Sequence, residues 1–235
     1  MLVWFIPERA RTESPTESIW RSLLPSAGLP PVTRAVFLAL LPSMAATWAL
    51  GGLYLSLGSS ILRTVLGVQS HFVVGIVLGV FFAAGAAGPL VTAPLAPRPR
   101  EWFGYATLIL GLIVTVAAMV VGALPLYVVG SLAAGVGFGA TFRFVISALG
   151  EVAPADQRGQ VFATMYIVSY LAFSLPGLAA GLAVGRFGLE PTAVTYGGSD
   201  VALVAAAMLA AVVQARRRAG VDEPWPACPA LSGAR

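Results

Sequence analysis

The chain alternates between long apolar runs and short tracts of polar residues and prolines. Each run has about the 20 residues that a helix needs to cross the roughly 30 Å hydrocarbon core of a bilayer. At this length, helices satisfy their own backbone hydrogen bonds within lipid. We therefore predict an all-α membrane protein with six transmembrane helices, at residues 35–58, 71–93, 103–122, 125–149, 161–185 and 193–214.

Composition supports this prediction and bears on the choice of partner. Apolar residues make up 58% of the chain and charged residues only 10%, whereas soluble domains carry about a quarter charged residues. The net charge is +4, and an excess of basic residues can indicate nucleic-acid binding. Here the arginines lie in short tracts between apolar runs. We therefore expect the lipid bilayer as a partner, and no nucleic acid.

The placement of arginine predicts the orientation, because basic loops remain on the cytoplasmic side. Six spans put both termini on one side. That side holds most of the arginines, whereas the other holds Arg63 and Arg186. We expect both termini in the cytoplasm, with residues 1–34 and 216–235 as tails around a bundle at 35–215. The absence of lysine fits a GC-rich bacterial genome, so we expect a bacterial cytoplasmic membrane.

Glycines recur at helical spacing in several runs. In lipid, small residues let helix backbones approach closely and so favour packing. The fifth run carries Gly177, Gly181 and Gly185 at intervals of four. The fourth run carries small residues on two sides, namely Gly135 and Gly139 on one, and Gly130, Gly137 and Thr141 on the other. We expect these glycines to be helix-packing positions.

Three short stretches carry a family resemblance. They are Phe5-Ile-Pro-Glu8, the polar tract Ala153–Ala163, and Gly181-Leu-Ala-Val-Gly-Arg-Phe-Gly188. In that order they resemble the end of the sixth helix, the loop before the eleventh helix, and the Gly-x-x-x-Asp-Arg-x-Gly loop of the major facilitator superfamily. The likeness is to the C-terminal half of its bacterial efflux transporters. Gly185 replaces the acid of that loop, so a charge-relay role is not supported here.

The resemblance implies a fold of twelve helices in two halves, with substrate bound between the halves near the midplane. Each half holds two inverted three-helix repeats, which here correspond to about 35–122 and 125–215. Met1 falls where the family's sixth helix ends, so we expect one half only. The second six-helix half would be joined covalently to this one, be a separate chain, or be another copy of this chain.

Two charged residues lie within the predicted spans, where charge is costly and often functional. Arg143 either faces a cavity and attracts an anionic group, or snorkels to the head groups. Asp200 either carries protons in a coupled transporter, or is an N-terminal residue of a late-starting helix, favoured by the helix dipole. For Asp200 we favour the second interpretation.

Aromatic and loop residues complete the candidates. Trp48, Tyr54, Tyr166 and Tyr170 either line a substrate cavity or serve packing and interfacial roles. Ser174 shares a helix face with the last two. In the loops, Asp156 and Arg158 either latch an inward gate or are solvated. The resemblance favours the latch, and Arg186 belongs to the similar Gly181–Gly188 loop.

We expect secondary active transport of a small molecule, and the resemblance implies drug or metabolite efflux coupled to protons. The alternatives are a non-transporting membrane subunit or scaffold, and an inactive truncated fragment. The glycines of Gly135–Gly139 lie inside an apolar helix, so they are not a phosphate-binding loop. No Ser/His/Asp set is available, and one histidine with a distant cysteine makes a metal site implausible. We expect no enzyme activity, metal or cofactor.

Overall fold

The computed structural model describes residues 27–219, and these residues form helices joined by short connections. The stretch Phe5–Glu8 and most of both predicted tails lie outside the described residues. The elements are α2 (Pro31–Ser56), α3 (Gly58–Ser60), the π-helical turn η2 (Ile61–Val65), α4 (His71–Val91), α5 (Pro97–Val121), α6 (Leu124–Val152), α7 (Arg158–Phe187) and α8 (Leu189–Ala219).

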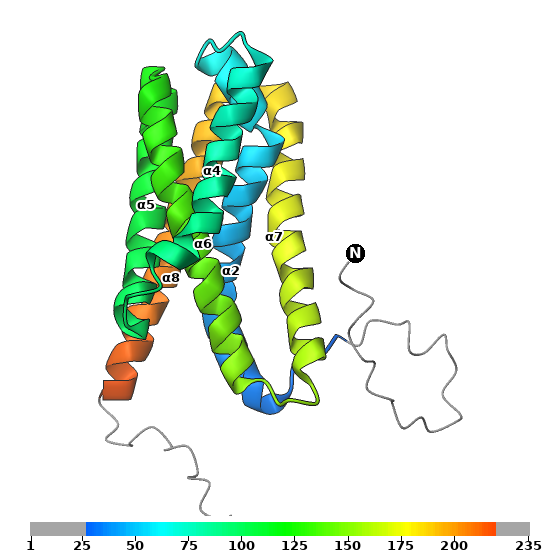
Figure 1. The fold of residues 1–235 in the computed structure, drawn as a ribbon. Coiled ribbons are helices and arrows are strands. Elements are labelled where there is room, and N and C mark those ends of the chain that lie inside the picture. Colours follow the sequence, from blue (N-terminus) through cyan, green and yellow to red (C-terminus); the bar gives the residue numbers. More distant parts are fainter. Residues whose placement is uncertain (1–26, 220–235) are drawn as a thin grey trace, which may run out of the picture.

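Six of these helices are long and apolar enough to cross a membrane, namely α2, α4, α5, α6, α7 and α8. They correspond one to one with the six predicted spans, which confirms the all-α membrane fold. Both ends of the described chain lie at the same end of the bundle, at the bottom of Figure 1. We refer to this end as the lower end and to the opposite one as the upper end.

Several helices begin earlier than the sequence predicts. α2 begins at Pro31 and not at residue 35, and α8 begins at Leu189 and not at 193. Each of these earlier starts contains a proline. In the first turn of a helix its missing N–H has no partner to lose, so proline is tolerated there. Pro31, Pro97, Pro125 and Pro191 all lie in first turns.

Two glycines allow the tightest connections between helices. Gly122 ends α5 with a φ of 67°, and Gly188 lies between α7 and α8 with a φ of 87°. This left-handed region is costly for residues with a Cβ. These glycines let the chain reverse within one or two residues, so that successive helices cross the membrane in opposite directions.

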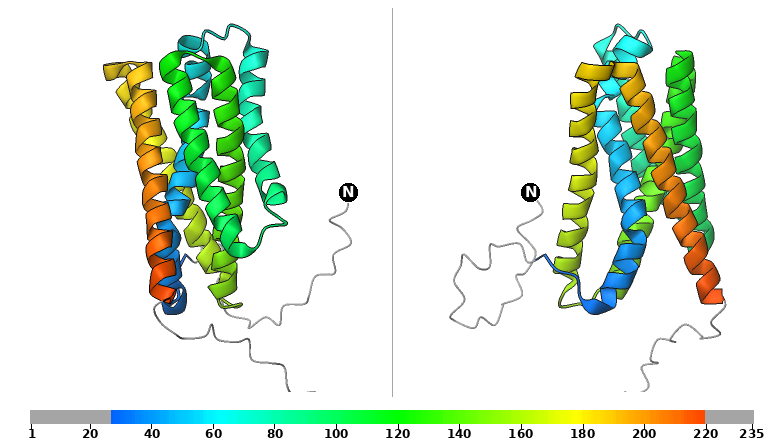
Figure 2. Two further views of the ribbon diagram at one scale, coloured as in Figure 1. Left: turned by 90° about the vertical axis from the view of Figure 1, so that its left-hand side faces the viewer. Right: turned by 180° about the vertical axis from the view of Figure 1, so that it is seen from behind.

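The helices of one set of three, α2–α4–α5, pack mainly against those of the other, α6–α7–α8. α4 and α5 both pack against α6 of the other set, just as α7 and α8 both pack against α2. α2 also contacts α6, and α5 contacts α8. Since two spans, α4 and α5, lie between α2 and α6, these two helices run in opposite directions. The sets are therefore inverted repeats. Figure 1 shows α4, α6, α2 and α7 across the front of the bundle, and Figure 2 shows α8 from behind.

Glycines bring α6 close to helices on both of its sides. A Cβ added at Gly139 would collide with the carbonyl oxygen of Gly85 on α4, and one at Gly135 with that of Phe81. On the other side, a Cβ at Gly137 would collide with the backbone of Leu108 on α5. The prediction that this helix packs through two small-residue faces is confirmed.

The packing prediction for α7 is wrong within the described chain. An added Cβ would meet nothing within 4 Å at Gly181 or Gly185, and only the Ser56 side chain, at 3.6 Å, at Gly177. α7 instead buries Val161, Met165, Ser169 and Ala180, which point elsewhere. In an apolar helix, glycines can lie on the face that packs against the rest of the chain or on the opposite face. The spacing of the glycines does not show which of the two faces they occupy.

Candidate functional site

An aromatic cluster joins α2, α6 and α7. At its centre the ring of Trp48 lies 5.3 Å from that of Tyr170, 5.7 Å from that of Phe142 and 6.4 Å from that of Phe173, all edge to face. Such geometry favours the contact between the positive ring edge and the negative ring face. The Trp48 Nε1–H is buried and has no hydrogen-bond partner among the described residues.

Tyr166, Tyr170 and Ser174 share one exposed face of α7, since they are four residues apart. The two tyrosine rings stack with centroids 6.3 Å apart, and Tyr170 is 58% exposed. Because Tyr170 also contacts Trp48, this face is continuous with the aromatic cluster. The structure thus brings together three of the four predicted aromatic residues, with Ser174 one turn beyond them.

Arg143 lies in a groove of about 520 Å³ between α4 and α6. Its Nη1 donates a hydrogen bond of 3.4 Å to the carbonyl oxygen of Pro89 across this groove. The groove is lined by Phe82, Gly85, Ala86, Pro89, Phe138, Gly139, Phe142, Arg143, Ile146 and Ser147. Since Phe142 belongs to both, the groove adjoins the aromatic cluster. We call the combined surface the aromatic–Arg143 face.

Sequence reasoning did not select Phe138 and Phe142. Phe138 lies 5.4 Å from Phe81, and its ring stacks on that of Phe142 at 6.4 Å. Their spacing of four residues, next to Arg143, was the available signal. Phenylalanine is common in apolar spans, however, so it does not stand out there as tyrosine and arginine do.

Tyr54 does not belong to this face, and its assignment to a substrate cavity is wrong. It is 1% exposed, and its ring stacks on that of Phe81 with centroids 4.0 Å apart. Its hydroxyl shares hydrogen bonds with Ser131 Oγ at 2.7 Å and Thr115 Oγ1 at 3.4 Å. Tyr54 therefore joins α2, α4, α5 and α6 in the core of the bundle.

Asp200 is buried in the bundle and is not a residue of the helix start. Because α8 begins at Leu189, Asp200 lies about three turns into the helix. It is 2% exposed, and neither carboxylate oxygen has a hydrogen-bond partner among the described residues. One turn earlier, Tyr196 contacts α2 and Gly197 lies against Val116 of α5. Asp200 therefore faces the interior, and the favoured interpretation is wrong.

The three loop candidates lie at the two ends of the bundle. Asp156, at the lower end, accepts a hydrogen bond of 3.2 Å from Gln157 Nε2, and Arg158 begins α7. Arg186, at the upper end, lies in the last turn of α7 with its guanidinium 5.8 Å from the ring centroid of Phe187. All three side chains are exposed. The structure does not bring them to the aromatic–Arg143 face.

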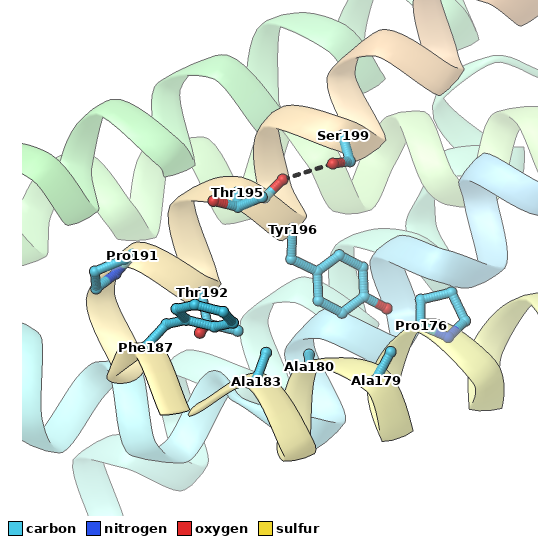
Figure 3. Close-up of a pocket in the computed structure, with 10 residues that line it drawn as sticks. All are labelled: Pro176, Ala179, Ala180, Ala183, Phe187, Pro191, Thr192, Thr195, Tyr196 and Ser199. Atoms are coloured by element: carbon cyan, nitrogen blue, oxygen red, sulfur yellow. Dashed lines mark hydrogen bonds between the residues drawn. The ribbon is translucent and has the colours of Figure 1, made fainter. Parts of the chain in front are cut away.

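A second groove, of about 550 Å³, separates α7 from α8. Figure 3 shows Ala179, Ala180 and Ala183 on one wall opposite Thr192 and Tyr196 on the other. The hydroxyl of Thr192 donates to the carbonyl oxygen of Gly188, and that of Ser199 to the carbonyl oxygen of Thr195 on its own helix. The Tyr196 hydroxyl donates to Ala49 of α2. With three of its four hydroxyls engaged in this way, the groove is a largely apolar surface suited to lipid chains. The aromatic–Arg143 face therefore remains the candidate site.

Comparison with known proteins supports the same family as the sequence motifs. The sequence model described as Major Facilitator Superfamily matches residues 1–177, which is about three-quarters of the chain. No curated protein sequence matches it. The matched residues reach from the first residue to the middle of α7, and the six apolar helices fit one half of the family's transporter fold. The chain belongs to the Major Facilitator Superfamily.

Proposed function

We propose that this chain forms half of a secondary transporter, in which the aromatic–Arg143 face is one wall of the substrate path. Membership of the superfamily makes it a membrane transporter of small molecules. The observation that carries the assignment to this face is the contact of Trp48 with both Tyr170 and Phe142, beside the Arg143 groove. Ligand sites commonly combine such apolar walls with a few polar groups.

The side chains of this face favour a particular class of substrate. Trp48, Tyr170 and Phe142 offer ring surfaces to a flat or apolar body. Arg143 offers a fork of N–H donors suited to a carboxylate or phosphate. The Trp48 Nε1–H, which is buried without a partner among the described residues, adds a donor close to the rings. An amphipathic organic anion, such as an aromatic acid, combines these features, and we propose efflux of a drug or metabolite of this type.

A second six-helix half would complete the path. Gly75 and Gly79 of α4 and Gly181 and Gly185 of α7 face open space within this chain. In lipid, helices associate through such small residues because backbones can come close. In Figure 1, α7 lies at one edge of the bundle and α4 crosses in front of α6. We propose that their open glycines pack against helices of that half, whether covalent, separate or a second copy.

Asp200 is the proposed coupling residue. An ionised carboxylate that is buried without a partner costs several kcal/mol, whereas the neutral acid costs far less. A group in this position therefore exchanges a proton whenever a movement of α8 against α2 or α5 opens it to water. In this scheme proton uptake and release at Asp200 accompany the rocking of the helices. The strong bias of arginine toward the lower end supports placing that end in the cytoplasm of a bacterial cell.

Transport by reconstituted protein tests the proposal. The full chain is inserted into proteoliposomes, alone and together with any six-helix partner that copurifies, and uptake of labelled aromatic acids is followed with and without an imposed proton gradient. Gradient-dependent uptake is expected. Stable insertion with no uptake under any of these conditions would instead favour a membrane subunit or scaffold, and failure to accumulate stably would favour an inactive fragment.

A further inference from the structure

A polar pocket lies at the upper end of the bundle, where α2 has ended and α4 begins. It has a volume of about 530 Å³ and is lined by Ser59, Ser60, Arg63, Thr64, Gln69, His71 and Val74. All but the last are polar, in a chain that is 58% hydrophobic. The candidate substrate site does not use any of these residues.

Arg63 and His71 face each other across this pocket. Arg63 Nη1 lies 2.7 Å from His71 Nε2. A guanidinium has only donors, so the imidazole nitrogen is the acceptor in this hydrogen bond. The remaining guanidinium N–H groups keep their capacity to bind an acceptor. No aspartate or glutamate lines the pocket among the described residues, so the positive charge of Arg63 has no neutralising carboxylate there.

The backbone near the end of α2 places hydroxyl and guanidinium hydrogen-bond donors around this pocket. η2 is a π-helical turn, a rare geometry that is frequent at functional sites. It carries Arg63 and Thr64, while Ser59 and Ser60 precede it, and all four side chains are exposed. Hydroxyl and guanidinium donors around one cavity suit a tetrahedral oxyanion, because arginine can engage two of its oxygens at once.

The position of the pocket relative to the membrane also favours such a ligand. α2 alone is 26 residues long, or about 39 Å of helix, which exceeds the roughly 30 Å hydrocarbon core. The turn that follows it therefore lies at the level of the lipid head groups. His71 begins α4 from the same level. Phosphate groups of phospholipids are the most abundant anions at this depth.

We propose that the pocket formed by Arg63, His71 and the neighbouring hydroxyls binds a phosphate group, supplied by a phospholipid headgroup or by a soluble phosphate. Arg63 donates to two phosphate oxygens, and the serine and threonine hydroxyls donate to the others. The site is independent of the proposed transport function, since it lies at the upper end and shares no residue with the aromatic–Arg143 face.

Lipid retention by the full chain tests the proposal. The protein is placed in nanodiscs that contain equal parts of phosphatidylglycerol and a phosphate-free galactolipid, and native mass spectrometry then measures the lipids that remain bound. Wild type is expected to retain phosphatidylglycerol selectively. Arg63→Gln is expected to lower this retention about tenfold, the effect of losing one charge-assisted hydrogen-bond pair. Arg63→Lys, which keeps the charge but not the fork, is expected to lie between the two.

Arg186→Gln is the matched control, because Arg186 is an exposed arginine at the same end of the bundle. It is expected to retain lipid as wild type does. A second measurement follows thermal unfolding in a phosphate-free maltoside detergent, with and without inorganic phosphate. If inorganic phosphate raises the unfolding temperature only when Arg63 is present, and the nanodiscs show no selective lipid retention, soluble phosphate is the source. Equal loss in both glutamine variants, or no dependence on Arg63 in either measurement, would overturn the proposal.

Discussion

The hydroxyl of Tyr196 on α8 donates a hydrogen bond of 2.8 Å to the carbonyl oxygen of Ala49 on α2. The same hydroxyl lies 2.9 Å from where a Cβ of Gly52 would stand, so this glycine makes room for it. Tyr196 thereby holds α8 against α2 one turn before Asp200. The contact therefore lies next to the buried, unpartnered carboxyl of Asp200.

Removal of this hydroxyl should loosen α8. Tyr196→Phe keeps the ring but loses the hydrogen bond, and we expect it to lower the free energy of unfolding by about 1 kcal/mol. Chemical denaturation of the purified chain in mixed micelles measures the change. Tyr166→Phe is the control, since Tyr166 is 40% exposed on α7. Equal stability of the two variants would show that the contact does not hold α8.

Asp200 should matter for coupling and not for stability. Asp200→Asn keeps the size of the side chain but has no carboxyl group to take up and release a proton. We therefore expect proton-driven uptake to be lost, while movement of substrate down its own concentration gradient remains. Asp200→Leu should unfold no more easily than wild type, because it removes a buried polar group without a partner. Both effects are read in proteoliposomes and by thermal unfolding.

Glu190→Gln serves as the control for this prediction, because Glu190 is an exposed acid in the first turn of the same helix. It should leave proton-driven uptake unchanged. Undiminished coupling in Asp200→Asn would rule out Asp200 as the coupling residue. A marked loss of stability in Asp200→Leu would mean that the carboxyl has a structural role.

The sequence predicted the number of spans well, because length and apolar content alone determine whether a helix can cross a bilayer. It also predicted the two-sided packing of α6, whose glycines at two spacings bring α4 and α5 close. It did not predict which face of a helix is buried. Tyr54 and Tyr170 lie in equally apolar runs, and yet one is 1% and the other 58% exposed. A transmembrane helix is apolar both where it faces lipid and where it faces protein, so no polar side distinguishes the exposed face from the buried one.

The error at Asp200 had a local cause. The sequence predicts a start at residue 193, whereas α8 begins at Leu189, directly after Gly188 ends α7 with a positive φ. The prediction therefore shifted the helix start by four residues and placed Asp200 near the membrane surface. This shift changed the interpretation of the one acid that is buried among the described residues.

The glycines of α6 and α7 should respond differently to substitution. Gly139→Ala places a methyl group against the carbonyl oxygen of Gly85, and we expect a loss of about 1–3 kcal/mol from such overpacking. Gly181→Ala meets open space, so the stability of the isolated chain should not fall. Thermal unfolding of the two variants provides the comparison. If Gly181→Ala destabilises the chain alone as much as Gly139→Ala, the assignment of an open face on α7 is wrong.

Substitutions at two tyrosines distinguish a structural role from a substrate-binding role. Tyr54→Phe removes hydrogen bonds to Ser131 and Thr115, so we expect lower stability by about 1 kcal/mol with an unchanged KM for transport. Tyr170→Ala removes an exposed ring from the aromatic–Arg143 face, so we expect a KM several-fold higher with unchanged stability. The opposite pattern, in which Tyr54→Phe raises KM and Tyr170→Ala unfolds the chain, would place the substrate path elsewhere.

Arg143 should be needed for transport of anions and not for folding. Its side chain is exposed, and its hydrogen bond to the carbonyl oxygen of Pro89 is long, at 3.4 Å. We therefore expect Arg143→Leu to insert and unfold as wild type does but to lower kcat/KM for an aromatic acid at least tenfold, the effect of losing one charged hydrogen bond. A neutral analogue of the same acid should be transported equally by both proteins. Arg186→Leu, which removes an exposed arginine away from the groove, is the control. If Arg143→Leu transports the acid as well as wild type, Arg143 is a snorkelling anchor, and the aromatic residues must select the substrate without it.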